Sequence, residues 1–234
     1  MQKDNTKSIE SFANDPIANV VIKNSIPALI AMVMVMVYNL ADTFFIGLTG
    51  DDLQVAAVSL ASPVFMIFMS LGTLFGVGGS SVISRALGAG KTDYAKKASS
   101  FCFWASTVIG VVFMALIWVF LDDLMLMLGA SENTMEYAGS YLRIAVGCGA
   151  FSMISNCLSN VIRTEGEPMK AMTGTLIGNL LNVILDPIMI LALGWGITGA
   201  AVATVIGNVV SALYYLAYFF KGNTALSIRL KDFS

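Results

Sequence analysis

The sequence predicts an all-α membrane protein, built as a bundle of six membrane-spanning helices. Of its 234 residues, 57% are apolar and only 12% are charged, whereas a soluble domain carries about 25% charged residues. The charges leave long intervals free, each close to the ~20 residues with which a helix crosses a bilayer. These intervals lack strict alternation and are too long for barrel strands. The composition therefore excludes a soluble globular protein, a disordered chain and a nucleic-acid-binding protein.

The first three spans follow from the first three such intervals. Residues 24–50 contain one charge, Asp42, and residues 53–84 contain none. The third span, about 95–121, carries charges only in its first turn and is uncharged from Ala98 onward. Each interval is long enough for one helical crossing.

Three more spans fill the second half of the chain. The fourth carries Arg143 near its outer end. Residues 171–220 contain one charge, Asp186, and are long enough for two helices. The cluster Gly194-Trp195-Gly196 predicts the turn between them. The expected spans are about 135–162, 170–193 and 197–220.

The basic residues predict the orientation, because cytoplasmic segments of membrane proteins are enriched in Lys and Arg. All of them except Arg143 fall on one side of the six spans, and the loops on the other side carry only acidic residues. We therefore expect both ends of the chain in the cytoplasm, with an N-terminal segment 1–16 that has no signal-peptide pattern and a tail 222–234. The inner basic residues are Lys3, Lys7, Lys23, Arg85, Lys91, Lys96, Lys97, Arg163, Lys170, Lys221, Arg229 and Lys231.

The residue inventory also argues against common enzyme and cofactor chemistry. The chain has no histidine, which removes the usual zinc and haem ligands, Ser-His catalysis and histidine proton relays. Its three cysteines lie in apolar segments without CxxC spacing and are interpreted as small buried apolar residues. We expect no enzymatic activity, no cofactor, no nucleic-acid partner and no metal beyond a possible Na+.

Two carboxylates, Asp42 and Asp186, fall inside apolar spans. Such a residue costs about 2.5–3.5 kcal/mol at the centre of an inserting helix, so it needs a partner, a proton, a cation or water. Asn182 lies four residues before Asp186, on the same helical face. Pro187 cannot donate to the carbonyl of Val183, which frees one more acceptor beside the acid. These groups predict a site for a proton or a small hard cation, with helix-packing hydrogen bonds as the alternative.

Further polar and flexible residues are weaker candidates. Asn156 and Thr204, taken alone, are typical of hydrogen bonds between helices. Methionine is abundant, with 14 residues, and its flexible thioether suits either a lipid-facing surface or an adaptable lining for apolar ligands. The residues expected to line a drug cavity are Met32, Met36, Tyr38, Met66 and Met69.

Four motifs together resemble the multidrug and toxic compound extrusion (MATE) family, and within it the MepA-like exporters of Gram-positive bacteria. They are Tyr38–Gly47 after Pro27, Ser84–Lys91, Arg163–Pro168, and Leu185-Asp186-Pro187 followed by Gly199–Thr204. The resemblance covers about residues 15–221. It implies drug export coupled to H+ or Na+, with Asp42, Asn156, Asn182, Asp186 and Thr204 as the cation-site residues. Pro27 and Pro187 would let their helices bend.

Family members have twelve spans in two six-helix lobes, whereas this chain has six. We therefore expect the amino-terminal lobe of an exporter of amphipathic or cationic drugs in a bacterial plasma membrane. Its partner would be a second lobe, from the same parent chain or from a second copy. The alternatives are a lipid-linked-precursor flippase, whose cavity tends to be basic, an intramembrane aspartyl protease, and an accessory or channel subunit. The protease is disfavoured because Val183-Ile184-Leu185 stands where a Gly-x-Gly motif would precede Asp186.

Overall fold

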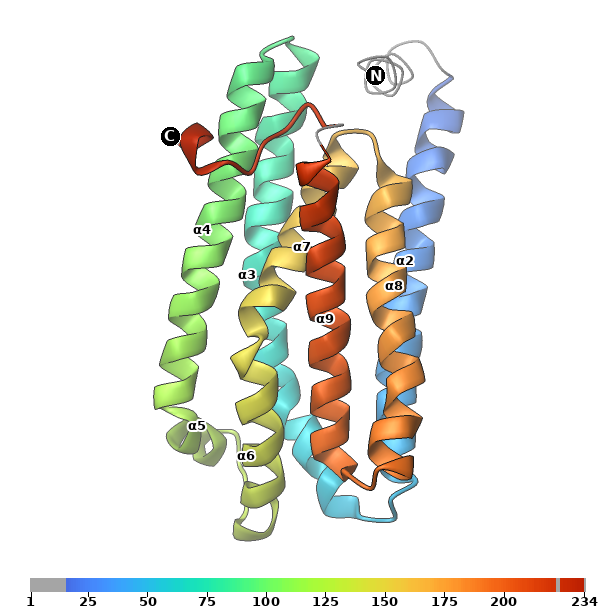
Figure 1. The fold of residues 1–234 in the computed structure, drawn as a ribbon, viewed down its shortest axis with the longest axis vertical. Coiled ribbons are helices and arrows are strands. Elements are labelled where there is room, and N and C mark those ends of the chain that lie inside the picture. Colours follow the sequence, from blue (N-terminus) through green and yellow to red (C-terminus); the bar gives the residue numbers. More distant parts are fainter. Residues whose placement is uncertain (1–15, 222–223, 234) are drawn as a thin grey trace.

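The computed structural model describes residues 16–221 and 224–233, and every regular element among them is helical (Figure 1). The expected all-α bundle is confirmed. The expected N-terminal segment lies outside the described residues, apart from Pro16. The elements are α2 (Ile17–Gly47), α3 (Asp52–Gly88), α4 (Thr92–Val119), α5 (Leu121–Met127), α6 (Glu132–Gly147), α7 (Gly149–Thr164), α8 (Pro168–Asp186), the π-helical turn η1 (Pro187–Ala192), α9 (Gly196–Phe220) and the 3₁₀ turn η2 (Leu230–Asp232).

Five helices in the described part of the chain are long and apolar enough to cross a membrane, with α8 and η1 together counted as one. A sixth crossing requires α6 and α7 together, and these two meet at Cys148 with a bend of 49°. The sequence predicted one continuous span there. Glycines at 147 and 149 flank the break, and small residues of this kind are a common cause of helix bending. A Cβ at Gly149 would lie 2.5 Å from the ring of Phe68, so the bend brings α7 close to α3.

The helix ends extend past the expected spans. The first helix begins at Ile17 and not near residue 24, and the second continues to Gly88 and not to residue 84. Both extensions carry charged side chains, Lys23 and Arg85, so charge marks the edge of the apolar interval and not the end of the helix. Gly90, with φ 69°, adopts the left-handed conformation that ends α3 and turns the chain into α4.

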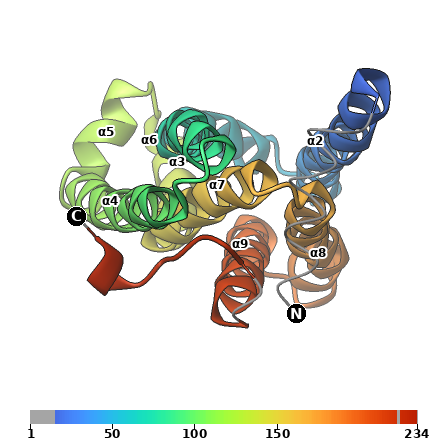
Figure 2. The same cartoon turned by 90° about the horizontal axis from the view of Figure 1, so that it is seen from above.

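The helices stand side by side, with α7 in the centre of the bundle (Figure 2). It packs against α3, α4, α8 and α9, whereas α2 lies at one side and packs chiefly along α8. Only 11% of the most apolar stretch of α2 is buried, against 44% for α9. The first helix is thus the least enclosed of the long helices.

The two ends of the bundle differ in charge. One end, at the top of Figure 1, holds the α3–α4 turn, the α7–α8 loop and both ends of the described chain. We call it the basic end, since Lys91, Lys96, Lys97, Lys170 and Lys221 lie there. The opposite end, the acidic end, holds Asp51, Asp52, Asp122, Asp123, Glu132 and Glu136. Arg143, the one basic residue toward that end among those the structure describes, lies 3.7 Å from Asp122, an exposed ion pair of small energetic value.

Glycines bring the central helices into close contact. A Cβ at Gly72 on α3 would lie 2.9 Å from the carbonyl oxygen of Met153 on α7. A Cβ at Gly178 on α8 would lie 2.0 Å from the hydroxyl of Ser211 on α9. Small residues at such contacts let helix backbones approach closely in membranes. These two contacts set how near α7 and α9 lie to their neighbours.

The segment after α9 packs against the bundle along α4, where the sequence predicted only a polar tail. Ser99 and Ser100 donate to the carbonyls of Ser227 and Arg229 at 2.8 and 2.7 Å, and Trp104 donates to that of Ile228 at 3.1 Å. Leu226 and Ile228 are buried in the apolar cluster at the basic end. The side-chain donors of α4 thus form hydrogen bonds with backbone carbonyls of a segment that has little regular secondary structure.

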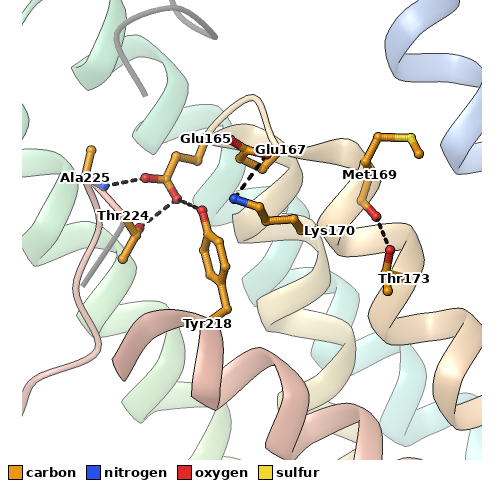
Figure 3. A network of polar contacts seen from close by, with 8 residues as sticks. All are labelled: Glu165, Glu167, Met169, Lys170, Thr173, Tyr218, Thr224 and Ala225. Carbon is orange, nitrogen blue, oxygen red and sulfur yellow. Dashed lines mark hydrogen bonds and ion pairs between the residues drawn. The ribbon is translucent and has the colours of Figure 1, made fainter. Parts of the chain in front are cut away.

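Glu165, in the α7–α8 loop, joins this segment to α9 (Figure 3). Its carboxylate accepts hydrogen bonds from the Tyr218 hydroxyl at 2.9 Å, the Thr224 hydroxyl at 2.7 Å and the Ala225 amide. Burial raises the pKa of Glu165, and the three donors offset part of that effect. The neighbouring Glu167 pairs with Lys170 at 3.4 Å.

Candidate functional site

The two span carboxylates lie on neighbouring helices in the acidic-end half of the bundle. Asp42 is on α2, five residues before the helix ends, and Asp186 is the last residue of α8 before its π turn. Asp42 is 7% exposed and Asp186 is fully buried. The helices pack along each other, and the two carboxylates interact electrostatically. The structure therefore brings together the two acids that the sequence singled out.

The acids and Asn182 present oxygen atoms that have no protein partner. Among the described residues, the buried side-chain oxygens without a hydrogen-bond partner are Asp42 Oδ1, Asn182 Oδ1 and both oxygens of Asp186. A buried, unpaired polar group costs about 1–3 kcal/mol, and more if it is charged. Such a cluster is stabilised by a proton or by a small cation that prefers oxygen ligands. In the described part of the chain, these acids do not belong to any group of three or more His, Cys, Asp or Glu side chains.

Asn182 is fixed by a bond to α9. Its amide nitrogen donates to the hydroxyl of Thr204 at 3.2 Å, which leaves its own carbonyl oxygen free for a ligand. The two residues lie beside the close α8–α9 contact, where a Cβ at Gly207 would be 3.4 Å from the Cβ of Asn182. Thr204, a weak candidate when judged alone, is thus a direct neighbour of the acid cluster.

Tyr141 on α6 is a member of this region that the sequence did not reveal. It is 3% exposed and lies within electrostatic range of Asp42, Asp186 and Tyr38. A buried tyrosine hydroxyl needs a hydrogen-bond partner. An isolated tyrosine in an apolar helix carries no motif that would have marked it.

The two prolines singled out by the sequence have different surroundings in the structure. After Pro187 the chain forms the six-residue π turn η1 before it reaches Gly194. Turns of this type occur often at functional sites. Pro27 is buried inside α2, which is assigned as one helix from Ile17 to Gly47. The π turn is therefore the larger irregularity, and it directly adjoins Asp186.

A cavity of about 480 Å³ lies between α2, α7, α8 and α9, with α3 contributing two residues. Most of the residues expected to line a drug site do line it. Met66 does not: it is 66% exposed on α3, where Phe65 and Met69, four residues apart, are the residues that reach the cavity. Of these expected residues, Met32, Met36, Tyr38 and Met69 lie in the lining, as do Asn156 and Thr204, which were expected at the cation site.

Asn156 belongs to the cavity and is not bonded to the acids. Its side-chain oxygen accepts from Thr73 at 3.3 Å and from Asn160 at 3.2 Å. Asn160 also donates to the Asn156 carbonyl, and its own carbonyl accepts from Thr164 at 2.9 Å. Asn156 is thus the first residue of a hydrogen-bonded row along α7, and it is separate from the bonded pair of Asn182 and Thr204.

Arg163 also lines the cavity, although its sequence position predicted a cytoplasmic loop. It is in the last turn of α7, and its Nε is buried without a partner, as is the amide nitrogen of Asn179. The spacing of Asn156, Asn160 and Arg163 places them on one helical face, which was a readable signal. The cavity thus carries unpaired donors at Arg163 and Asn179, while the acid cluster carries unpaired acceptors.

Comparison with known proteins agrees with this arrangement. Residues 27–188 match the family model described as MatE. The chain is 34% identical over 220 residues to the multidrug export protein MepA of Staphylococcus aureus, covering 94% of this chain and 49% of that protein. It also resembles a solved structure described as MATE in the bent conformation, at 33% identity and a TM-score of 0.90 over 97% of this chain and 51% of the other.

A third match is a solved structure of a MOP superfamily transporter from Pyrococcus furiosus, described as having a reversed polarity of its binding pocket that suggests a different function. The identity is 33% and the TM-score 0.86, over 92% of this chain and 48% of that one. The chain spans about half the length of the relatives it matches. The family model covers more than half of the chain, and the helical bundle agrees with it. The chain therefore belongs to the MATE family of membrane transporters.

Proposed function

We propose that this chain forms one lobe of a cation-coupled exporter of xenobiotics, with H+ or Na+ as the coupling ion. The observation that carries the proposal is the cluster of unpaired buried oxygens on Asp42, Asn182 and Asp186. The names of its relatives, which include multidrug export proteins, support the transported class. The substrates would be amphipathic or cationic small molecules.

In this proposal the cation acts by neutralising two buried carboxylates on neighbouring helices. When the ion is bound, Asp42 and Asp186 share it and hold α2 against α8. When the ion leaves, the two negative charges repel each other in a poorly hydrated site, which favours separation of the helices. The first helix can respond because so little of its surface is buried in this lobe. Pro27 and the π turn after Pro187 supply places where α2 and α8 can bend.

The drug would occupy the cavity next to the cation site. Thr204 lines the cavity and also accepts the hydrogen bond from Asn182, so one residue touches both regions. A change at the acid cluster is transmitted to the cavity through that bond. Met32, Met36 and Met69 offer adaptable apolar surface to ligands of varied shape.

Orientation and assembly follow from charge and length. We propose that the basic end faces the cytoplasm of a bacterium, as the bias of Lys and Arg predicts. A second six-helix lobe would complete the transporter, from the remainder of a longer chain or from a second copy. The exposed methionines and leucines of α2 offer apolar surface for that contact or for lipid.

A second candidate, a transporter of anionic substrates such as a lipid-linked precursor, is favoured by Arg163. Within the described chain this guanidinium lines the cavity and has no ion-pair partner. A cationic drug would be repelled by it, whereas a phosphate or carboxylate would be bound. Exchange of Arg163 for Gln separates the two proposals. Export of a cationic dye is maintained or improved if the first holds, and export of an anionic substrate is lost if the second holds.

The direct test of coupling uses membrane vesicles that contain the complete transporter. A pH gradient and a sodium gradient are imposed separately, and the movement of a fluorescent organic cation is followed. We expect one of the two gradients to drive dye movement and its collapse by the matching ionophore to stop it. Dye movement that requires neither gradient would overturn the coupling proposal.

A further inference from the structure

A second hollow lies on the bundle, away from the acid cluster and the drug cavity. It is a groove of about 560 Å³ between α3 and α4, and it shares no lining residue with the cavity. Leu74, Gly78 and Val82 line its α3 side at spacings of four residues. Tyr94, Lys97 and Phe101 line its α4 side at spacings of three and four. At 1.5 Å per residue, each stripe runs about 12 Å or less along its helix.

Two glycines shape this groove in different ways. A Cβ at Gly79 would lie 2.2 Å from the sulfur of Cys102, so Gly79 lets α3 and α4 meet closely at the base. A Cβ at Gly78 would meet nothing within 4 Å, so the space above Gly78 is open. The result is a short, mainly apolar groove with a closed base and an open side.

The charged rim lies at the basic end of the groove. Lys97 has no carboxylate within ion-pair distance in the described part of the chain, whereas its neighbour Lys96 pairs with Asp93 at 3.7 Å. Tyr94 stands one turn before Lys97 and is 57% exposed. Along the α3–α4 turn, Arg85, Lys91, Lys96 and Lys97 face a single acid, Asp93. Lys97 is therefore the groove-lining cation, and its ammonium has no ion-pair partner in the described part of the chain.

We propose that this groove binds one phospholipid with an anionic headgroup. One acyl chain lies in the groove over Gly78 between Leu74 and Phe101. The phosphate lies at the rim, where the ammonium of Lys97 and the hydroxyl of Tyr94 are the donors. Basic pockets between membrane helices are a recurring place for anionic headgroups, and an aromatic hydroxyl suits the membrane interface. The proposal is independent of the transported substrate.

The test is native mass spectrometry of the chain purified in a neutral detergent. Phosphatidylglycerol and phosphatidylcholine with identical acyl chains are added in equal amounts, and retained lipid is counted. We expect one retained lipid, with phosphatidylglycerol favoured about fivefold, the usual effect of one basic residue beside an anionic headgroup. Lys97→Gln reduces that preference to about one, and Lys96→Gln, the matched control outside the groove, leaves it unchanged. Gly78→Leu places a large side chain in the groove and lowers retention of both lipids.

Several results would overturn the proposal. For the unaltered chain, these results are equal retention of the two lipids or retention of neither. For the lysine variants, they are an unchanged preference for phosphatidylglycerol in Lys97→Gln or a loss of that preference in Lys96→Gln as large as in Lys97→Gln. For a folded Gly78→Leu, the result is full retention of both lipids. Circular dichroism and a single elution peak establish that each variant is folded. If Gly78→Leu does not fold, the comparison of Lys97→Gln with Lys96→Gln still decides the outcome.

Discussion

Asn182 on α8 donates its amide hydrogen to the hydroxyl of Thr204 on α9, while its carbonyl oxygen stays unpaired one helical turn before Asp186. The bond fixes which way the amide faces, because an asparagine that donates with its nitrogen presents its oxygen on the other side. Thr204 therefore fixes the orientation of the Asn182 amide beside Asp186 and also lines the neighbouring cavity.

Replacement of Thr204 tests this relationship. In Thr204→Val the buried amide of Asn182 loses its acceptor, so we expect a loss of about 1–3 kcal/mol in the free energy of unfolding. Thr204→Ser keeps the hydroxyl and should lose much less. Titration with a denaturing detergent, followed by circular dichroism, measures both. Equal stability of the valine and serine variants would mean that the bond is not formed.

The contact of α8 with α9 gives a second prediction. Gly178→Ala places a methyl group 2.0 Å from the hydroxyl of Ser211 and 2.5 Å from the carbonyl oxygen of Gly207. Overpacking of this kind costs about 1–3 kcal/mol, so the same titration should show Gly178→Ala to be destabilised.

Gly78→Ala is the matched control for this substitution. It lies in a helix with no atom within 4 Å of the added carbon, and alanine favours a helix over glycine. It should unfold no more easily than the unaltered chain. If both variants behave alike, the close contact at Gly178 is wrong.

Glu165 is the subject of a third prediction. Its removal in Glu165→Ala leaves the Tyr218 hydroxyl, the Thr224 hydroxyl and the Ala225 amide without their shared acceptor. We expect the segment after α9 to detach from α4, and hydrogen exchange at the Ala225 amide to accelerate at least tenfold, as for a lost charged hydrogen bond of about 1.5–3 kcal/mol. Glu167→Gln, which removes only the partner of Lys170, should leave that rate unchanged. Comparable acceleration in both variants would argue against a specific role for Glu165.

Much of this architecture was predictable from the positions of charged residues. The helical class followed because an uncharged interval of ~20 residues has the length and the apolar character of a membrane-spanning helix. The two acids followed because a carboxylate inside such a helix is energetically costly and therefore rare. The break at Cys148 was not predictable, because the apolar pattern runs through it and only the flanking glycines hint at it. The described helices extend to Ile17 and Gly88, beyond the predicted spans, because a charged residue ends an apolar interval without ending the helix.

The composition of the site was predictable only in part. Asn182 was found through its spacing from Asp186. Thr204 lies on another helix: the sequence marked it as a residue typical of hydrogen bonds between helices, and the family resemblance made it a candidate for the site. Tyr141 depends on how helices pack, which a single sequence does not encode in any short motif, whereas Arg163 shares a helical face with Asn156 and Asn160, a spacing that the sequence does show. The docking of residues 224–233 on α4 likewise depends on donors such as Ser99 and Trp104, whose role is visible only once the helices are assembled.

The central claim is that Asp42 and Asp186 together bind the coupling ion, and gradient-driven export tests it most directly. Asp42→Asn and Asp186→Asn are introduced separately into the complete transporter, and the initial rate of fluorescent-cation efflux is measured under the driving gradient. Asp123→Asn, the same change at an exposed acid on α5, is the control. We predict that each span variant loses at least tenfold in rate while the control keeps its rate. Undiminished export by both span variants, at equal expression, would contradict the account.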